Sequence, residues 1–78
     1  MEKKIVAKIA QSSDTNHFNR QLAKLRELRG KQSYMRDYVV NQLVYIAEAN
    51  HKFKERIFDF LAEDSEGLEI LVRMIVSG

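Results

Sequence analysis

Apolar residues near the start of the chain repeat every second position, and this period predicts a β-strand. Over residues 3–9, Ile5, Ala7 and Ile9 fall on one side of an extended chain. The β-branched residues and the polar stretch 11–16 favour a strand over the helix that Ile5 and Ile9, four apart, would also permit. No second strand is visible in the sequence, so the predicted partner is the same strand of a second chain.

The next apolar residues have the period of a helix. Asp14 or Thr15 is expected to cap it at the N-terminus, and Gly30 to end it in a left-handed conformation. The stripe that predicts this helix contains Phe18, Leu22, Leu25 and Leu28.

A second helix is expected from Ser33, as its N-cap, to about Ala49. It is apolar nearly all round, which in so small a chain indicates burial against a second subunit. A third helical segment, before a break at residues 64–67, is marked by Phe53, Ile57, Phe60 and Leu61. A short last helix, with more apolar surface than one stripe needs, contains Leu68, Leu71, Val72 and Ile75.

The length of 78 residues limits the chain to one marginal domain. Surface scaling gives about 4,900 Å² folded against about 13,200 Å² unfolded, so roughly 60% is buried. Cysteine is absent, which excludes disulfides and thiolate metal sites, and His17 and His51 lie far apart. Oligomerisation is therefore the expected source of extra stability. No metal and no cofactor is predicted.

No apolar run approaches the roughly 20 residues of a membrane-spanning helix. The start, Met-Glu-Lys-Lys, is not followed by a sustained apolar block, so no signal peptide is evident. The expected protein is cytoplasmic and does not bind a membrane.

Charge is divided unevenly along the sequence. Residues 1–40 hold nine Lys or Arg and four acids, a net charge of +5, whereas residues 41–78 hold four and seven, a net charge of −3. This asymmetry indicates a face that binds a polyanion and a separate face for another contact.

Together, the basic strand, the helix, the Gly-containing turn and the Ser-capped helix resemble the ribbon-helix-helix family of DNA-binding proteins, to which the Arc and MetJ repressors belong. The resemblance covers about residues 3–49 and rests on Lys4-Ile-Val-Ala-Lys-Ile9, Phe18/Leu22/Leu25 and Gly30-Lys-Gln-Ser33 leading into Met35/Val39/Leu43. The expected fold is mainly α with one N-terminal β-strand. It is an intertwined dimer with an intermolecular antiparallel ribbon over residues 1–50 and a C-terminal helical extension over residues 51–78. Two departures are the long loop 11–16 and that extension.

In such a dimer the ribbon enters the major groove of double-stranded DNA. Lys4 and Lys8 would then donate to guanine, and Val6 would contact a thymine methyl. The resemblance also implies a phosphate clamp at the start of the second helix, formed by Lys31, Ser33 and Tyr34. Further candidates for phosphate contact are Arg29 and Arg36.

These observations predict a homodimeric transcriptional repressor that binds a double-stranded DNA operator, with higher-order assembly on DNA, and not an enzyme. A plasmid maintenance or transfer regulator is the setting it most resembles. Alternatives are a DNA-binding antitoxin whose C-terminal helices bind a toxin, a relaxosome accessory protein, and a protein-binding inhibitor with no DNA role.

Overall fold

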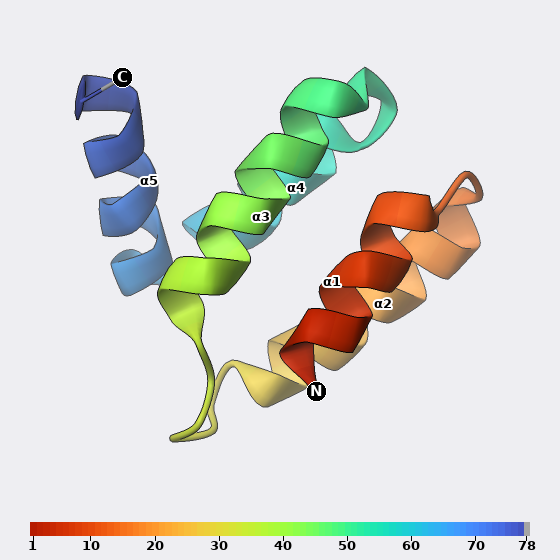
Figure 1. Cartoon of the computed structure of the whole chain (residues 1–78), viewed down its shortest axis with the longest axis horizontal. Helices are drawn as coiled ribbons and strands as arrows, with labels where there is room; N and C mark the ends of the chain where they lie inside the picture. Colours follow the sequence, from red (N-terminus) through yellow and green to blue (C-terminus); the bar gives the residue numbers. More distant parts are fainter. Residues whose placement is uncertain (78) are drawn as a thin grey trace. The chain divides into compact units, whose positions relative to one another are not determined.

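The N-terminal segment is a helix, so the predicted strand is wrong. The computed structural model describes residues 1–77, and within them α1 spans Glu2–Gln11 and no strand occurs (Figure 1). Val6 and Ile9 are buried, whereas Ala7 is exposed and Ile5 is half-buried. A helix satisfies its backbone groups internally and needs no second chain, so the structure offers neither a ribbon nor the dimer built on one.

Helix α2, Thr15–Leu28, forms an antiparallel hairpin with α1 (Figure 1). Its predicted N-cap is confirmed: the Asp14 side chain accepts a hydrogen bond of 3.3 Å from the backbone N–H of Asn16. The helix ends at Leu28, the last residue of the predicted apolar stripe. No glycine among residues 1–77 has a positive φ, so Gly30 does not end the helix in the left-handed way expected. The apolar core of the hairpin contains Val6, Ile9, Phe18, Leu22 and Leu25.

Helix α3 spans Arg36–Ala49 and begins three residues after the predicted cap, Ser33. A 3₁₀ turn, η1 (His51–Phe53), leads into α4, Lys54–Ala62, which matches the predicted third helical segment. The apolar face of α3 is covered by η1, α4 and α5 of the same chain. Its buried residues are Val39, Val40, Leu43, Ile46 and Ala47.

Helix α5, Ser65–Ser77, packs beside α3 and α4 (Figure 1). The helical structure is interrupted at Glu63–Asp64, between α4 and α5. Gly67 therefore lies inside α5 and not in the predicted interruption. Arg36 joins the start of α3 to this corner: its Nε lies 2.8 Å from Oδ2 of Asp64, and its NH1 nitrogen lies 2.7 Å from Oε2 of Glu66. This ionic bridge fixes where α5 starts relative to α3.

The chain divides into two units, Met1–Met35 and Arg36–Gly78. They are called here the N-terminal unit (α1 and α2) and the C-terminal unit (α3, η1, α4 and α5). The boundary lies between Met35 and Arg36, whereas the sequence pattern predicts a boundary at residue 50. Within residues 1–77, no helix is long and apolar enough to cross a membrane.

Candidate nucleic-acid interface

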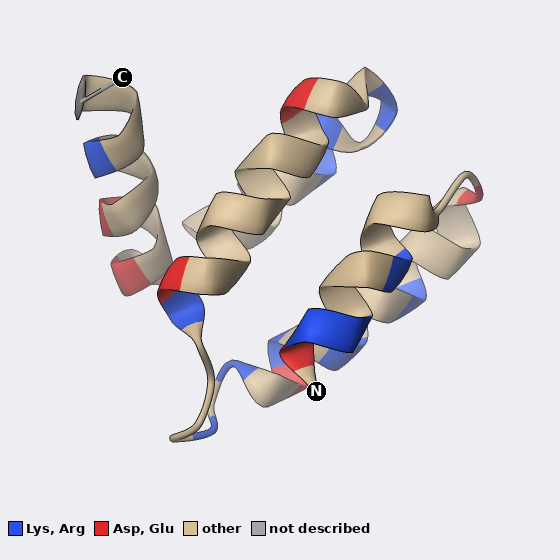
Figure 2. Ribbon diagram, in the orientation of Figure 1, with Lys and Arg blue, Asp and Glu red and all other residues tan. Residues whose placement is uncertain are grey.

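The division of charge coincides with the division of structure. The N-terminal unit holds eight Lys or Arg and three Asp or Glu, a net charge of 8 − 3 = +5. The C-terminal unit holds five Lys or Arg and eight Asp or Glu, a net charge of 5 − 8 = −3. In Figure 2 the ribbon is blue at Lys and Arg positions of α1 and α2, whereas α5 carries red Asp or Glu positions in its first part and one blue position further on. The basic excess therefore belongs to one structural element, the helical hairpin.

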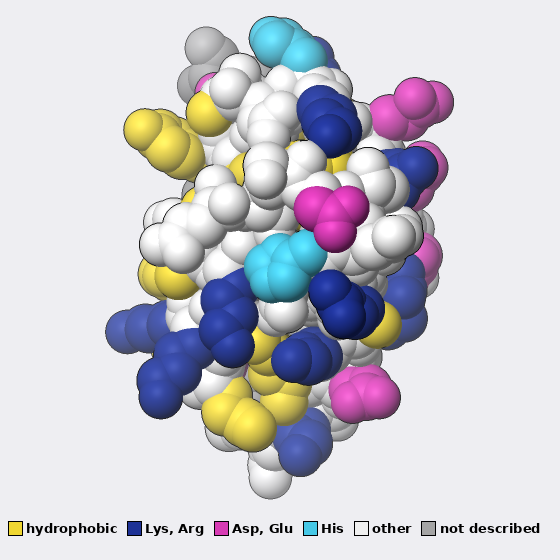
Figure 3. Space-filling model, turned by 90° about the vertical axis from the view of Figure 1, so that its right-hand side faces the viewer, with side chains coloured by type: hydrophobic (Ala, Val, Ile, Leu, Met, Phe, Trp, Pro, Cys, Tyr) yellow, Lys and Arg dark blue, Asp and Glu magenta, His cyan; other side chains and the backbone are white. Residues whose placement is uncertain are grey.

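Two pairs of basic residues form rows on the outer faces of this hairpin. Lys4 and Lys8 are four residues apart on α1, and Arg20 and Lys24 are four apart on α2. All four are exposed, and residues at this spacing lie one above the other, about 6 Å apart along a helix axis. Lys and Arg side chains gather on the face that Figure 3 presents. We call these four residues the basic surface.

The packing of the hairpin explains why its charges point outward. The buried residues of α1 recur at positions 2, 6 and 9, and those of α2 at positions 18, 21, 22 and 25. Each set follows the helical period, so the opposite side of each helix is left to polar and charged residues. The same pattern that forms the core therefore presents the basic surface to the solvent.

Of the three predicted base-reading residues, the structure exposes two. Lys4 and Lys8 project from α1, but Val6 is only 3% exposed and belongs to the core. The helical period puts Val6 on the same face as Ile9, whereas a strand would have put it beside the lysines. The prediction that Val6 contacts a thymine methyl is therefore wrong.

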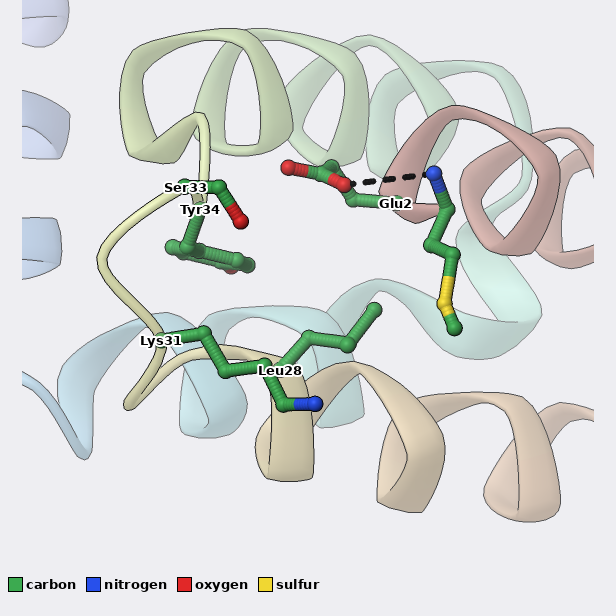
Figure 4. Close-up of a pocket in the computed structure, with 6 residues that line it drawn as sticks. Glu2, Leu28, Lys31, Ser33 and Tyr34 are labelled. Atoms are coloured by element: carbon green, nitrogen blue, oxygen red, sulfur yellow. Dashed lines mark ion pairs between the residues drawn. The ribbon is translucent and has the colours of Figure 1, made fainter.

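The three predicted phosphate-binding residues lie together around one pocket. Lys31, Ser33 and Tyr34, from the segment after α2, line a cavity of 220 Å³ together with Met1, Glu2 at the start of α1 and Leu28 at the end of α2 (Figure 4). Since α3 begins only at Arg36, Ser33 does not cap it, and the predicted clamp at a helix N-terminus is not formed.

Glu2 determines the chemistry of this pocket. Its Oε1 accepts a hydrogen bond of 3.0 Å from the backbone N–H of Met35, and its Oε2 lies 3.5 Å from the amino group of Met1 (Figure 4). Hydrogen bonds from its own backbone N–H and from that of Met35 hold the pKa of Glu2 below its usual value. The Glu2 carboxylate is thus held by the Met1 amino group and the Met35 N–H, and these contacts close one end of the hairpin.

The two further candidates for phosphate contact are Arg29, the half-buried residue that follows the last residue of α2, and Arg36 at the start of α3. The guanidinium of Arg36 contacts Asp64 and Glu66, and its side chain is only 27% exposed. An arginine held by two carboxylates is neutralised locally, so Arg36 has a structural role within the C-terminal unit.

The sequence pattern does not single out Arg20, Lys24 and Glu2 as functional residues. The i, i+4 spacing of Arg20 and Lys24 opposite the apolar stripe of a correctly predicted helix was a usable signal. No signal was available for Glu2, because its role depends on a contact with Met35, 33 positions away.

No group of three or more His, Asp or Glu that could hold a metal ion occurs in the part of the chain that the structure describes. Comparison with known proteins adds no relative: no family model, no curated protein and no solved structure matches the chain.

Proposed function

We propose that the chain is a DNA-binding regulatory protein whose N-terminal unit contacts double-stranded DNA through the basic surface. One observation carries the proposal: a net charge of +5 is concentrated on a 35-residue helical hairpin, while the rest of the chain is at −3. A polyanion attracts such a hairpin and repels the C-terminal unit, so the N-terminal unit is the part that would contact DNA.

The geometry of α1 supports duplex DNA as the polyanion. The major groove of B-DNA is wide enough to admit a helix as well as a ribbon. Lys4 and Lys8 lie on the exposed side of α1, and Val6 and Ile9 hold the other side against α2. The helix thus enters a groove, or lies along the phosphates beside it, without exposing the core.

The contacts proposed are mainly electrostatic. Lysine and arginine that neutralise phosphates release counterions, and the observed affinity then falls as salt is added. The regulatory role that we propose is transcriptional repression in the cytoplasm. A protein that occupies an operator needs no catalytic step to repress transcription.

The test is a titration of fluorescent duplex DNA with the whole chain at several salt concentrations. The double variants Lys4→Ala/Lys8→Ala and Arg20→Ala/Lys24→Ala should each weaken binding. The logarithm of the association constant falls linearly with the logarithm of the salt concentration. Each double variant should make this negative slope shallower by about 2, because two phosphate contacts are lost.

The matched control is Lys52→Ala/Lys54→Ala, which changes the net charge equally but alters two exposed lysines of the C-terminal unit. It should keep the slope of the unaltered chain. Equal losses in the control and in the basic-surface variants, or no salt-dependent binding at all, would overturn the proposal. Cognate and scrambled duplexes in parallel would show whether Lys4 and Lys8 read bases or only contact phosphates.

A further inference from the structure

Helix α5 presents a continuous apolar row to the solvent. Leu68, Val72, Ile75 and Val76 are 41%, 50%, 69% and 80% exposed. Their spacing of four, three and one places them on one side of the helix, next to the side on which Leu71 is buried. We call these four residues the α5 stripe.

The stripe continues into a hollow at the edge of α3. A cavity of 300 Å³ is lined by residues of both helices, and Ile75 belongs to the cavity and to the stripe. The other lining residues are Val44, Glu48, Leu71 and Met74. An apolar ridge beside an apolar hollow can receive a second surface of the same shape.

The charges beside the stripe indicate what that second surface is. Glu69 and Arg73 are neighbours on α5, joined by an ion pair of 3.3 Å, and both side chains are about two-thirds exposed or more. If two α5 helices pack antiparallel about a two-fold axis level with residue 71, Glu69 of one copy lies opposite Arg73 of the other, in both directions. In a parallel pair the flanks that carry Glu69 and Arg73 would lie on opposite sides of the interface, so this reciprocal contact would not form.

We propose that two copies of this chain associate through their α5 stripes in an antiparallel pair, with reciprocal contacts between Glu69 and Arg73. This contact replaces both sequence-based grounds for a dimer, since the ribbon does not exist and the apolar face of α3 is covered within its own chain. The proposal is independent of DNA binding. A stripe on one helix is small beside the roughly 800 Å² per partner of a stable dimer, so the association is weak and reversible.

The test is sedimentation equilibrium of the whole chain, without DNA, over a wide concentration range. The apparent mass should rise from one chain at low concentration towards two chains at high concentration. Val72→Asp should raise the dissociation constant at least about tenfold. Ala62→Asp, which adds the same charge at an exposed position of α4, should leave it unchanged.

Exchanging the charges at Glu69 and Arg73 tests whether a second copy of the chain covers the α5 stripe. Both side chains are exposed, so these variants do not disturb the core. Glu69→Arg alone and Arg73→Glu alone should each weaken self-association, because each places like charges opposite each other. The two single variants mixed together, and the double variant Glu69→Arg/Arg73→Glu, should associate as the unaltered chain does. A chain that stays monomeric at every concentration, as expected if another protein or another part of the same chain covers the stripe, would overturn the proposal. So would a dimer unaffected by both single variants, which would place its interface elsewhere.

Discussion

Glu2 and Met35 are 33 positions apart in the sequence, and a hydrogen bond of 3.0 Å from the Met35 backbone N–H to Oε1 of Glu2 joins them. The bond connects the first turn of α1 to the last residue of the N-terminal unit. It holds the segment after α2 against the start of α1, so the hairpin is closed at the end opposite its loop.

The Glu2 contact predicts that stability depends on pH in the acid range. The pKa of Glu2 in the folded chain is below its ordinary value of 4.5 because its own backbone N–H and that of Met35 bind the carboxylate. The contribution is complete above the unfolded pKa and is lost as pH falls through the folded pKa. Glu2→Gln should remove this part of the dependence, as measured by thermal unfolding followed by circular dichroism from neutral to strongly acidic pH.

Glu27→Gln is the control for this experiment. Glu27 is an exposed acid of α2, so its replacement removes the same charge without removing the contact with Met35. If Glu2→Gln and Glu27→Gln change the pH profile equally, the hydrogen bond to Met35 is not the cause of the dependence.

Arg36→Ala should destabilise the C-terminal unit by about 1 kcal/mol, because two ionic contacts with Asp64 and Glu66 are lost together. Arg36→Lys should recover only part of this, since one ammonium cannot reproduce the planar guanidinium fork. Urea unfolding measures the free energy. The exposed helical pair of Arg73 with Glu69 gives the comparison: Arg73→Ala should cost no more than about 0.5 kcal/mol.

Asp14→Ala should cost about 1 kcal/mol of stability, because the backbone N–H of Asn16 at the start of α2 loses its acceptor. Asp14→Asn keeps a side-chain oxygen at the same position and should restore most of the loss. Amide hydrogen exchange should show faster opening in the first turn of α2 for the alanine variant. A loss spread evenly over α3–α5 would contradict a local capping effect.

Gln21→Met should stabilise the chain by about 1 kcal/mol. Gln21 is 5% exposed, and its Oε1 has no hydrogen-bond partner among residues 1–77. Methionine has a similar length and removes the desolvation cost of that oxygen. The midpoint of urea unfolding checks the result, with the exposed Gln11→Met as the control that should change little. A destabilised Gln21→Met variant would show that the amide is satisfied in solution.

The N-terminal segment shows where a single sequence misleads. Ile5, Ala7 and Ile9 alternate as in a strand, but Val6 and Ile9 also fit a helical stripe that continues back to Glu2. Both periods are present within seven residues, and only packing against α2 decides between them. Helices with long stripes, such as the one through Phe18 and Leu25, were predicted correctly because one period alone fits them.

The residue at which a helix starts, and the partner that covers an apolar face, depend on contacts that a sequence does not show. Ser33 is a good capping residue, yet α3 starts at Arg36, where Asp64 and Glu66 hold the arginine. Leu68, Val72 and Ile75 were predicted as the stripe of the last helix together with Leu71, but only Leu71 is buried. An apolar row shows that a face avoids water and does not show which partner covers it.

The peptide bond between Met35 and Arg36 joins the two units directly, and each side of it is anchored by carboxylates of its own unit: Glu2 holds the Met35 N–H, while Asp64 and Glu66 hold the Arg36 side chain. The turn at Gly30 is different, because no atom lies within 4 Å of a side chain added there and extra residues can loop into solvent. This turn is therefore a suitable place in the N-terminal unit to splice in a tag or a spacer.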